Sequence, residues 1–226
     1  MYVRTGYFTG DPSTIDQALD GLRAEAVGLL SAQPGYRGYG LFADRERGVI
    51  LMGSWWDTAQ HERDSAERLR QRRDELLAPF ATTTAVEVLE ATVVTPPAPV
   101  GPGAGFRLVR FDFEPDRGDE LAEGFRAGAL PALQGMDGFV SAALLLNRAV
   151  GRGSVGVVFA DRAALAASRG RRPRPGRRPP PPARSSARWR SSTWSCWSAR
   201  RNRPGRGPAE GPAGRLRPRG PVGALA

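Results

Sequence analysis

Two adjacent tryptophans and a single histidine are the side chains of this sequence best suited to take part in chemistry. Trp55 and Trp56 end a predicted strand, and neighbouring residues on a strand point to opposite faces. We therefore expect one indole ring in the core and the other free to form an aromatic wall for a planar ligand, unless both are structural. His61 follows Asp57 by four residues on a predicted helix. It is a candidate general base because imidazole titrates near neutrality, although a solvent-exposed surface histidine is the plainer interpretation.

Two tyrosines and a serine complete the set of candidate substrate-binding residues. Tyr36 and Tyr39 lie on the second predicted strand in opposite orientations, where either phenol could donate a proton to a ligand carbonyl or pack half-buried against the sheet. Ser65 lies on the helix of His61 and could face a cleft, but no order of Ser, His and Asp residues would activate it as a nucleophile. The charged residues around Ser65 predict a solvated helix face; they are Arg63, Asp64, Glu67, Arg68, Arg70, Arg72 and Arg73.

The remaining reactive residues exclude several kinds of site. Cys196 is the only cysteine, so neither an internal disulfide framework nor a cysteine-based zinc cluster can form. One histidine cannot build a multi-histidine metal site. The glycines of residues 101–105 belong to a segment interrupted by proline, which does not form a phosphate-binding loop. We therefore expect no metal and no cofactor.

The chain also lacks the sequence marks of a membrane or secreted protein. No apolar run approaches the length that spans a bilayer. Residues 1–5 read directly into a strand, without the basic start and apolar stretch of a signal peptide. We therefore expect no membrane partner and a cytoplasmic location.

Apolar periodicity predicts six elements in residues 1–95. The order is strand, helix, strand, strand, helix, strand, which is the split βαβ pattern of ferredoxin-like α+β folds. The first helix starts after an Asp11-Pro12-Ser13 cap signal, and the second is capped by Asp57. The strands are expected at residues 2–9, 36–43, 49–55 and 85–94.

The same pattern restarts after a proline- and glycine-rich linker at residues 96–105. Residues 106–168 repeat a strand, a helix, a hairpin and the start of a helix, with Asp137-Gly138-Phe139 in the place of Pro34-Gly35-Tyr36. We expect Ala160 where the first copy has Trp56, and the second copy has no histidine. The sequence therefore predicts a tandem of two modules, the second incomplete, with any site in the first module.

The basic charge of the chain lies almost entirely in its last quarter. All 33 basic residues are arginines, which is typical of a very GC-rich genome of the actinomycete kind because lysine codons are AT-rich. Residues 1–168 hold 17 Arg against 22 Asp and Glu, a net charge of −5. Residues 169–226 hold 16 Arg against one Glu, a net charge of +15. A disordered arginine- and proline-rich tail is the direct interpretation of this last segment.

A shifted reading frame gives this tail a different meaning. Written in GC-rich codons and read one frame over, residues 188–199 become an apolar, valine-rich strand. Trp189 lies 21 positions after Ser168, as Val86 lies 21 positions after Ser65. We therefore infer a one-base slip near Arg169 that removes the last helix and strand of the second module.

A genuine arginine arm is the alternative to the frameshift. Its positive charge would bind nucleic acid or another anionic surface by releasing counterions. Trp189, Trp194 and Trp197 could stack on bases. Nucleic acid is therefore an expected partner only if the tail is real coding sequence.

Two short motifs and the order of elements resemble the antibiotic biosynthesis monooxygenase (ABM) superfamily. Gln33-Pro34-Gly35-Tyr36 opens the second strand, and Gly53-Ser54-Trp55-Trp56-Asp57 joins the third strand to the second helix. The resemblance covers residues 1–94 well and 106–168 more weakly. It implies a dimeric α/β barrel in which two sheets face each other, here supplied either by the two modules of one chain or by a homodimer. Ligands of such proteins bind between a sheet and its helices.

The resemblance implies two kinds of function. One is a monooxygenase that uses neither metal nor flavin, in which a small aromatic or quinol-type substrate loses a proton and its carbanion reduces O₂. The other is a non-catalytic ligand-binding or stress-related module with the same fold. Haem degradation, known in other relatives, is not expected, because residues 2–9 contain no Asn and His61 follows Trp56 too closely.

Overall fold

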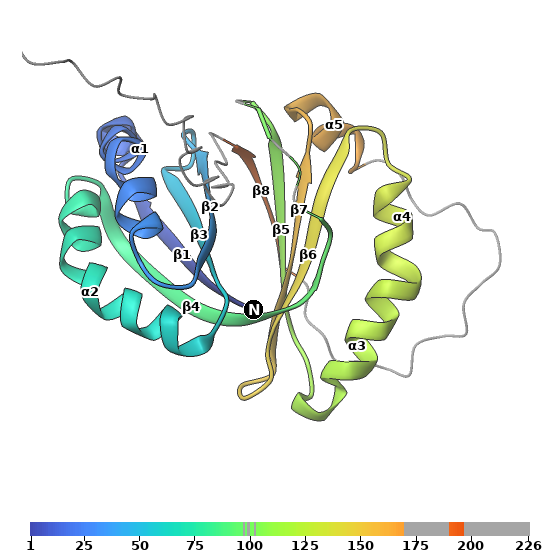
Figure 1. The fold of residues 1–226 in the computed structure, drawn as a ribbon. Helices are drawn as coiled ribbons and strands as arrows, with labels where there is room; N and C mark the ends of the chain where they lie inside the picture. Colours follow the sequence, from blue (N-terminus) through green and yellow to red (C-terminus); the bar gives the residue numbers. More distant parts are fainter. Residues whose placement is uncertain (97, 99, 102, 170–189, 197–226) are drawn as a thin grey trace, which may run out of the picture.

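The computed structural model describes residues 1–96, 98, 100–101, 103–169 and the backbone of 190–196. The first module has the expected order of elements (Figure 1). A 3₁₀ turn at Pro12–Thr14 precedes its first helix, and the Asp11 carboxylate caps that turn by accepting a hydrogen bond from the Ser13 N–H at 2.8 Å. The elements are β1 (Tyr2–Gly10), α1 (Ile15–Ser31), β2 (Tyr36–Asp44), β3 (Val49–Trp56), α2 (Ala59–Leu77) and β4 (Ala81–Val94).

The second module repeats this order, with one irregular helix. A π turn (Phe125–Ala129) interrupts the expected helix that follows the first strand of this module, just before Pro131, which has no N–H to continue the α-helical ladder. The elements are β5 (Gly105–Asp112), α3 (Gly118–Gly124), α4 (Leu130–Gln134), β6 (Phe139–Asn147), β7 (Arg152–Phe159), α5 (Arg162–Ala167) and β8 (Arg190–Cys196).

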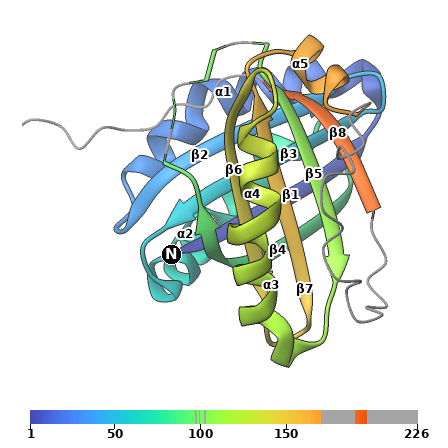
Figure 2. The ribbon, with the colours of Figure 1, turned by 90° about the vertical axis from the view of Figure 1, so that its right-hand side faces the viewer.

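All the strands pair antiparallel and form one closed barrel in the order β1-β3-β2-β8-β5-β7-β6-β4. The modules join at two seams, where β4 pairs with β6 and β2 pairs with β8. Helices α1 and α2 cover one outer side of the barrel, and α3 and α4 cover the opposite side (Figures 1 and 2). The expected α+β, ferredoxin-like fold is confirmed, and one chain supplies both sheets.

Each sheet has two apolar faces, which accounts for this arrangement. In the first module, Phe8, Leu22 and Trp56 belong to a core between the sheet and its helices. The other face of the same strands presents Val3 and Leu89 to the barrel interior, where they pack against residues of β6. Since successive strand residues alternate between faces, each strand contributes to both cores.

Repeated backbone contacts show which residues correspond in the two modules. Gly35 and Gly138 have φ angles of 75° and 72°, and their carbonyls accept hydrogen bonds from the Asp57 and Ala160 N–H groups at 2.9 and 2.7 Å. Ala160 therefore corresponds to Asp57. The expectation that it replaces Trp56 was wrong by one position, and Phe159, like Trp56, is completely buried.

The cap of the second helix also differs from the expectation. Thr58, rather than Asp57, caps α2, because its hydroxyl accepts a hydrogen bond from the His61 N–H at 3.1 Å. Asp161 does the same in the second module, accepting from the Ala164 N–H at 2.7 Å. The Asp57 carboxylate is instead bonded to the His61 ring.

Most of the predicted tail lies outside the described residues, namely 170–189 and 197–226. The described backbone of β8 pairs with β5 over Arg190–Ser195 and with β2 at Ser195 and Cys196. This is the barrel position that corresponds to β4 in the first module. The frameshift and the nucleic-acid-binding arm both stay predictions. Within the described ranges, no helix is long and apolar enough to cross a membrane.

Replacing Gly35 by alanine should destabilise the fold by about 1–3 kcal/mol. Its φ of 75° is in the left-handed region, and an added Cβ would collide with Asp57 Oδ1 and the His61 ring. Gly28→Ala is the matched control, since it lies exposed within α1 with nothing within 4 Å of an added Cβ. Urea unfolding of both variants is the measurement. Equal stability of the two would contradict this account of the junction between α1 and β2.

Candidate functional site

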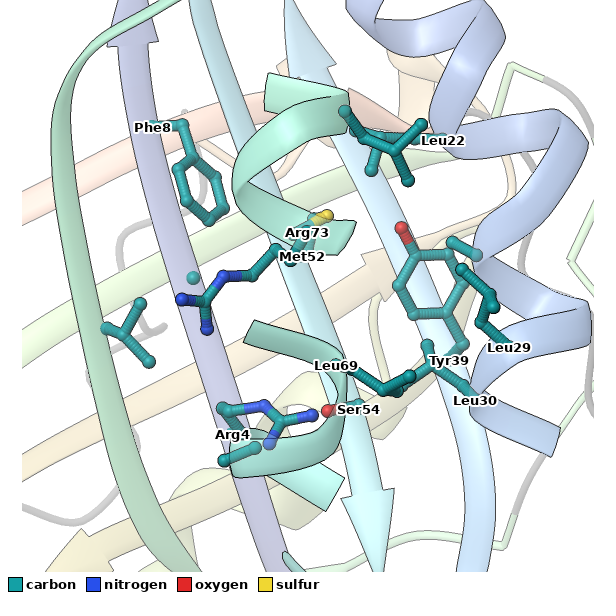
Figure 3. A pocket seen from close by; sticks show the side chains of 15 residues that line it. Arg4, Phe8, Leu22, Leu29, Leu30, Tyr39, Met52, Ser54, Leu69 and Arg73 are labelled. Carbon is teal, nitrogen blue, oxygen red and sulfur yellow. The ribbon is translucent and has the colours of Figure 1, made fainter. Parts of the chain in front are cut away.

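A cleft of about 70 Å³ lies between the first sheet and helices α1 and α2 (Figure 3). Its walls are largely apolar, and they come from the sheet, from α1 and from α2. The apolar lining residues are Phe8, Leu22, Ala26, Leu29, Leu30, Met52, Ala66, Leu69, Leu76 and Val86. Such a cleft is suited to a small, mostly apolar ligand.

Two arginines reach this apolar cleft from different walls. Arg4 shares a face of β1 with Gly6 and Phe8, and Arg73 comes from α2, on the stripe of Ala66, Leu69 and Leu76 (Figure 3). Gly6 leaves room for the Phe8 ring, which would lie within 2.7 Å of an added Cβ there. The cleft therefore combines an apolar lining with two guanidinium groups, and that of Arg73 also donates to the Asp74 carboxylate at 2.9 Å.

Arg4, which lines the cleft, is held by a buried ion pair with Glu62 of α2. Its Nη1 lies 3.2 Å from Glu62 Oε1 and also donates to the Glu62 carbonyl at 3.2 Å. The two side chains are only 10% and 3% exposed. The Arg4 guanidinium lies 5.4 Å from the centroid of the Trp56 ring, within the range of a cation–π contact. These contacts fix the direction of the guanidinium.

In this pair, burial shifts the pKa of each side chain more strongly than the attraction between the two charges does. It lowers the pKa of Arg4, although Glu62 opposes the shift, and the positive charge of Arg73 lowers it further. Burial also raises the pKa of Glu62, against the opposing effect of Arg4. Arg4 still carries its charge at neutral pH. An anionic ligand placed between Arg4 and Arg73 would therefore relieve an electrostatic cost that the folded protein already carries.

Tyr39 supplies a hydrogen-bond donor to the same cleft. Its side chain is 6% exposed, and its buried hydroxyl has no hydrogen-bond partner in the part of the chain that the structure describes. Burial raises the pKa of this phenol, so it stays protonated. Figure 3 shows the ring on the wall formed by β2. Its hydroxyl can donate to a ligand oxygen.

Strict alternation along the strand had suggested that Tyr36 and Tyr39 point to opposite faces of the sheet. This expectation was wrong. The pairing of β2 with β3 shifts register between Tyr36 and Gly38, and this bulge places both rings on the helix side of the sheet. Tyr36 packs edge-on to Trp56 at 5.9 Å between ring centroids. Burial raises the pKa of Tyr36 to about 12. It does not belong to the cleft lining.

The two tryptophans point to opposite faces, as expected. Trp56 is fully buried on the helix side, where its Nε1 donates to the Ser54 hydroxyl at 3.0 Å. Trp55 lines the barrel interior. Ser65 is buried, and its hydroxyl donates to the Glu62 carbonyl at 2.9 Å. Of the predicted substrate-binding residues, only Tyr39 lines the cleft between sheet and helices.

His61 lies at the start of α2, outside the cleft lining. Its Nδ1 is 2.7 Å from Asp57 Oδ1, and Asp57 Oδ2 accepts from Arg37 Nη2 at 3.0 Å. The hydrogen bond with His61 is the main cause of a lowered pKa of Asp57. The role of His61 as a general base stays a prediction. In the described ranges, no three His, Cys, Asp or Glu side chains lie close enough to hold a metal ion.

The second module has an arginine that corresponds to Arg4, but it lacks the side chains that correspond to Glu62 and Tyr39. Arg107 donates to the Ser168 hydroxyl at 2.6 Å and to the Leu165 carbonyl at 3.2 Å, and Leu165 stands where the first module has Glu62. Ala142 pairs with Val157 as Tyr39 pairs with Ser54, so no phenol stands there. The position that corresponds to Arg73 falls outside the described residues.

Arg4, Glu62 and Arg73 were missed as site residues in the sequence analysis. Arg73 was assigned to a solvated helix face with its charged neighbours. Its three- and four-residue spacing from Leu69 and Leu76 placed it on the apolar stripe and could have identified it. Arg4 alternates with the interior residues of β1 and shares its face with Phe8, which was a similar signal.

The chain has relatives in sequence among known proteins. No protein-family model matches the chain. Two uncharacterized proteins of Mycobacterium tuberculosis (strain ATCC 25618 / H37Rv) are similar in sequence. Rv2557 is 29% identical over 159 residues, which cover 70% of this chain and 71% of that protein. Rv2558 is 28% identical over 155 residues, covering 69% of this chain and 66% of that protein.

Solved structures show the same architecture at low sequence identity. A candidate monooxygenase from Lactobacillus acidophilus NCFM has a TM-score of 0.64 at 10% identity, covering 88% of this chain and 95% of that one. An anthrone oxidase-like protein has a TM-score of 0.63 at 15% identity, covering 88% and 92%. The chain therefore shares the fold of these solved structures, an α+β barrel of the kind that the resemblance had implied.

The stability of the protein relative to a Glu62→Gln variant should decrease as the pH rises. The folded-state pKa of Glu62 lies above its ordinary value of 4.5. The folded state therefore binds the Glu62 proton more tightly than the unfolded state, and stability is lost as the pH rises through the folded-state pKa. Urea unfolding of both proteins from pH 4 to pH 8 is the measurement. A stability difference that instead increases with pH would show that Arg4 outweighs the cost of burial.

Proposed function

We propose that this protein is a monooxygenase-like enzyme without a cofactor that oxidises a small aromatic or quinol-type substrate in the cleft between the first sheet and its helices. Its fold is that of the candidate monooxygenase and anthrone oxidase-like structures. The arrangement of Arg4, Arg73 and Tyr39 around an apolar cleft is the observation that carries the proposal. Small-molecule binding in this cleft is common to both functions that the resemblance implies.

The two arginines favour the ionised form of an acidic substrate. An apolar cleft strengthens charge interactions, and two guanidinium groups lower the pKa of a bound enol or phenol. Tyr39 stays protonated and can donate a hydrogen bond to the oxygen on which the negative charge develops. One ring of an aromatic substrate can pack against the apolar side chains of Leu22, Leu69 and Met52. Because the cleft holds only about 70 Å³, the other rings of a larger substrate such as anthrone must extend out of it or move the helices apart.

The reaction of an anthrone illustrates the chemistry. Loss of one proton from the methylene carbon gives a carbanion, which transfers electrons to O₂ and forms a carbon–oxygen bond. Cleavage of the O–O bond leaves one oxygen atom as the new carbonyl. The other oxygen leaves as water with the two hydrogens that the carbon has lost. Substrate carbon is oxidised and O₂ is reduced, so no further reductant is required.

One observation favours the non-catalytic alternative. Among the described lining residues of the cleft there is no carboxylate and no imidazole. A substrate must therefore be acidic enough to lose its proton to water once it is bound near the arginines. A protein that binds aromatic anions without turning them over would have the same lining. Oxygen uptake separates the two functions.

Anthrone should cause O₂ uptake with wild-type protein, and the Arg73→Gln and Tyr39→Phe variants should each lower kcat/KM at least roughly 10-fold. Each variant removes one group that stabilises the anion. An oxygen electrode, with anthraquinone measured by absorbance, gives the rates. Arg70→Gln is the matched control, because Arg70 is exposed on the same helix outside the cleft. Tyr36→Phe likewise removes a buried phenol that does not line the cleft.

Binding of anthrone without O₂ uptake would assign the chain to the non-catalytic alternative. Equal losses in the Arg73 and Arg70 variants would contradict the placement of the site. Retained activity in Tyr39→Phe would remove the phenol from the proposed mechanism.

A further inference from the structure

We infer a second small-molecule site inside the barrel, which takes a neutral single-ring aromatic compound with an N–H or O–H donor. A cavity of about 120 Å³ lies between the two sheets. Cavities on the order of 150 Å³ accept one benzene-sized ring. This cavity is on the opposite face of the first sheet from the cleft. Thr5 and Trp55 line it, whereas their neighbours Arg4 and Ser54 line the cleft.

Part of the cavity wall consists of strand backbone at glycine positions, next to the side chain of Trp55. Gly40, Gly53 and Gly156 line the cavity together with Trp55. A Cβ added at Gly53 would find nothing within 4 Å. The space above this glycine is therefore open, and a flat ring can lie against the strand beside the Trp55 side chain.

Glu87 supplies the polar contact that defines the ligand. It shares the interior face of β4 with Leu89, and it lines the cavity. Its Oε1 is buried and accepts no hydrogen bond from the part of the chain that the structure describes. A carboxylate oxygen in this position is costly unless it receives a donor. A ligand N–H or O–H group would satisfy it.

The charge of the cavity favours a neutral ligand. Arg110 also lines it, with its guanidinium 4.9 Å from the centroid of the Tyr7 ring. One carboxylate and one guanidinium leave the lining without net charge among the described residues. A cationic ligand would be repelled by Arg110 and an anionic ligand by Glu87. This preference differs from that of the cleft, where both charged side chains are arginines.

Both modules build this site. Thr5, Trp55 and Glu87 come from the first module, whereas Arg110 and Gly156 come from the second. The cavity therefore exists only when the two sheets face each other. The cleft, in contrast, is lined by first-module residues alone.

Ligand-observed NMR with aniline and toluene at neutral pH, where aniline is uncharged, tests the inference. The two compounds have nearly the same shape, but only aniline has a donor. We expect aniline to bind at least 10-fold more tightly than toluene, because toluene leaves Glu87 without a partner. Glu87→Met should abolish this preference. Glu90→Met is the matched control, because Glu90 lies on the same strand outside the cavity lining.

A variant with a larger side chain inside the cavity shows whether aniline binds there or in the cleft. Gly53→Leu occupies the open space on the interior face and should abolish aniline binding, while Arg73→Gln should leave it unchanged. If Gly53→Leu does not fold, the comparison of Glu87→Met with Glu90→Met decides alone. Absence of aniline binding, equal affinity for aniline and toluene, or an unchanged preference in Glu87→Met would each overturn the inference.

Discussion

The structure depends on one constraint, namely that a sheet covered by helices on one face must also bury the other. Val3, Leu51 and Leu89 lie on the uncovered face of the first sheet and are almost completely buried in the barrel. A single module would expose them to water, at a cost of about 25 cal/mol per Å² of apolar surface. The strands of residues 105–159, supplied by the same chain, cover this face and remove that cost. Because β4 pairs with β6 and β2 pairs with β8, closure also removes the free strand edges of the first sheet.

Because the opposite face of the sheet is buried in the barrel, the face covered by α1 and α2 can hold polar groups around a cleft. There the first module has a buried arginine, a second arginine and a phenol, all around apolar side chains, and the phenol has no hydrogen-bond partner among the described residues. Two of these groups cost stability in the free protein, because burial disfavours the charge on Arg4 and leaves the Tyr39 hydroxyl without a hydrogen-bond partner among the described residues. Such costs are typical of binding sites, where a ligand compensates them. The second module, with Ala142 and Leu165 at the corresponding positions, lacks the phenol and the carboxylate.

Local patterns predicted the elements of this fold well, because apolar periodicity and the turn glycines determine them directly. The opposite orientation of Trp55 and Trp56 was also predictable, since their strand is regular there. The relation of Tyr36 to Tyr39 was not, because a β-bulge changes which face each residue occupies and leaves no mark in residue type. The roles of Arg4 and Arg73 needed the packing of α2 on β1. The charge of Arg73 suggested a solvated position, and only the positions of both residues on apolar stripes indicated that they lie between the sheet and the helices.

The central claim is that the cleft stabilises a substrate anion, and the ionisation of a bound anthrone tests it most directly. The anthrone anion absorbs at longer wavelength than the neutral compound, so a spectrophotometric pH titration without O₂, which prevents turnover, gives its pKa in the complex. We expect wild-type protein to lower this pKa by at least about one unit relative to free anthrone, since two guanidinium groups face an apolar cleft. We expect most of that shift to disappear in Arg73→Gln. A pKa that is unchanged or raised on binding would show that the apolar walls dominate and would contradict the account.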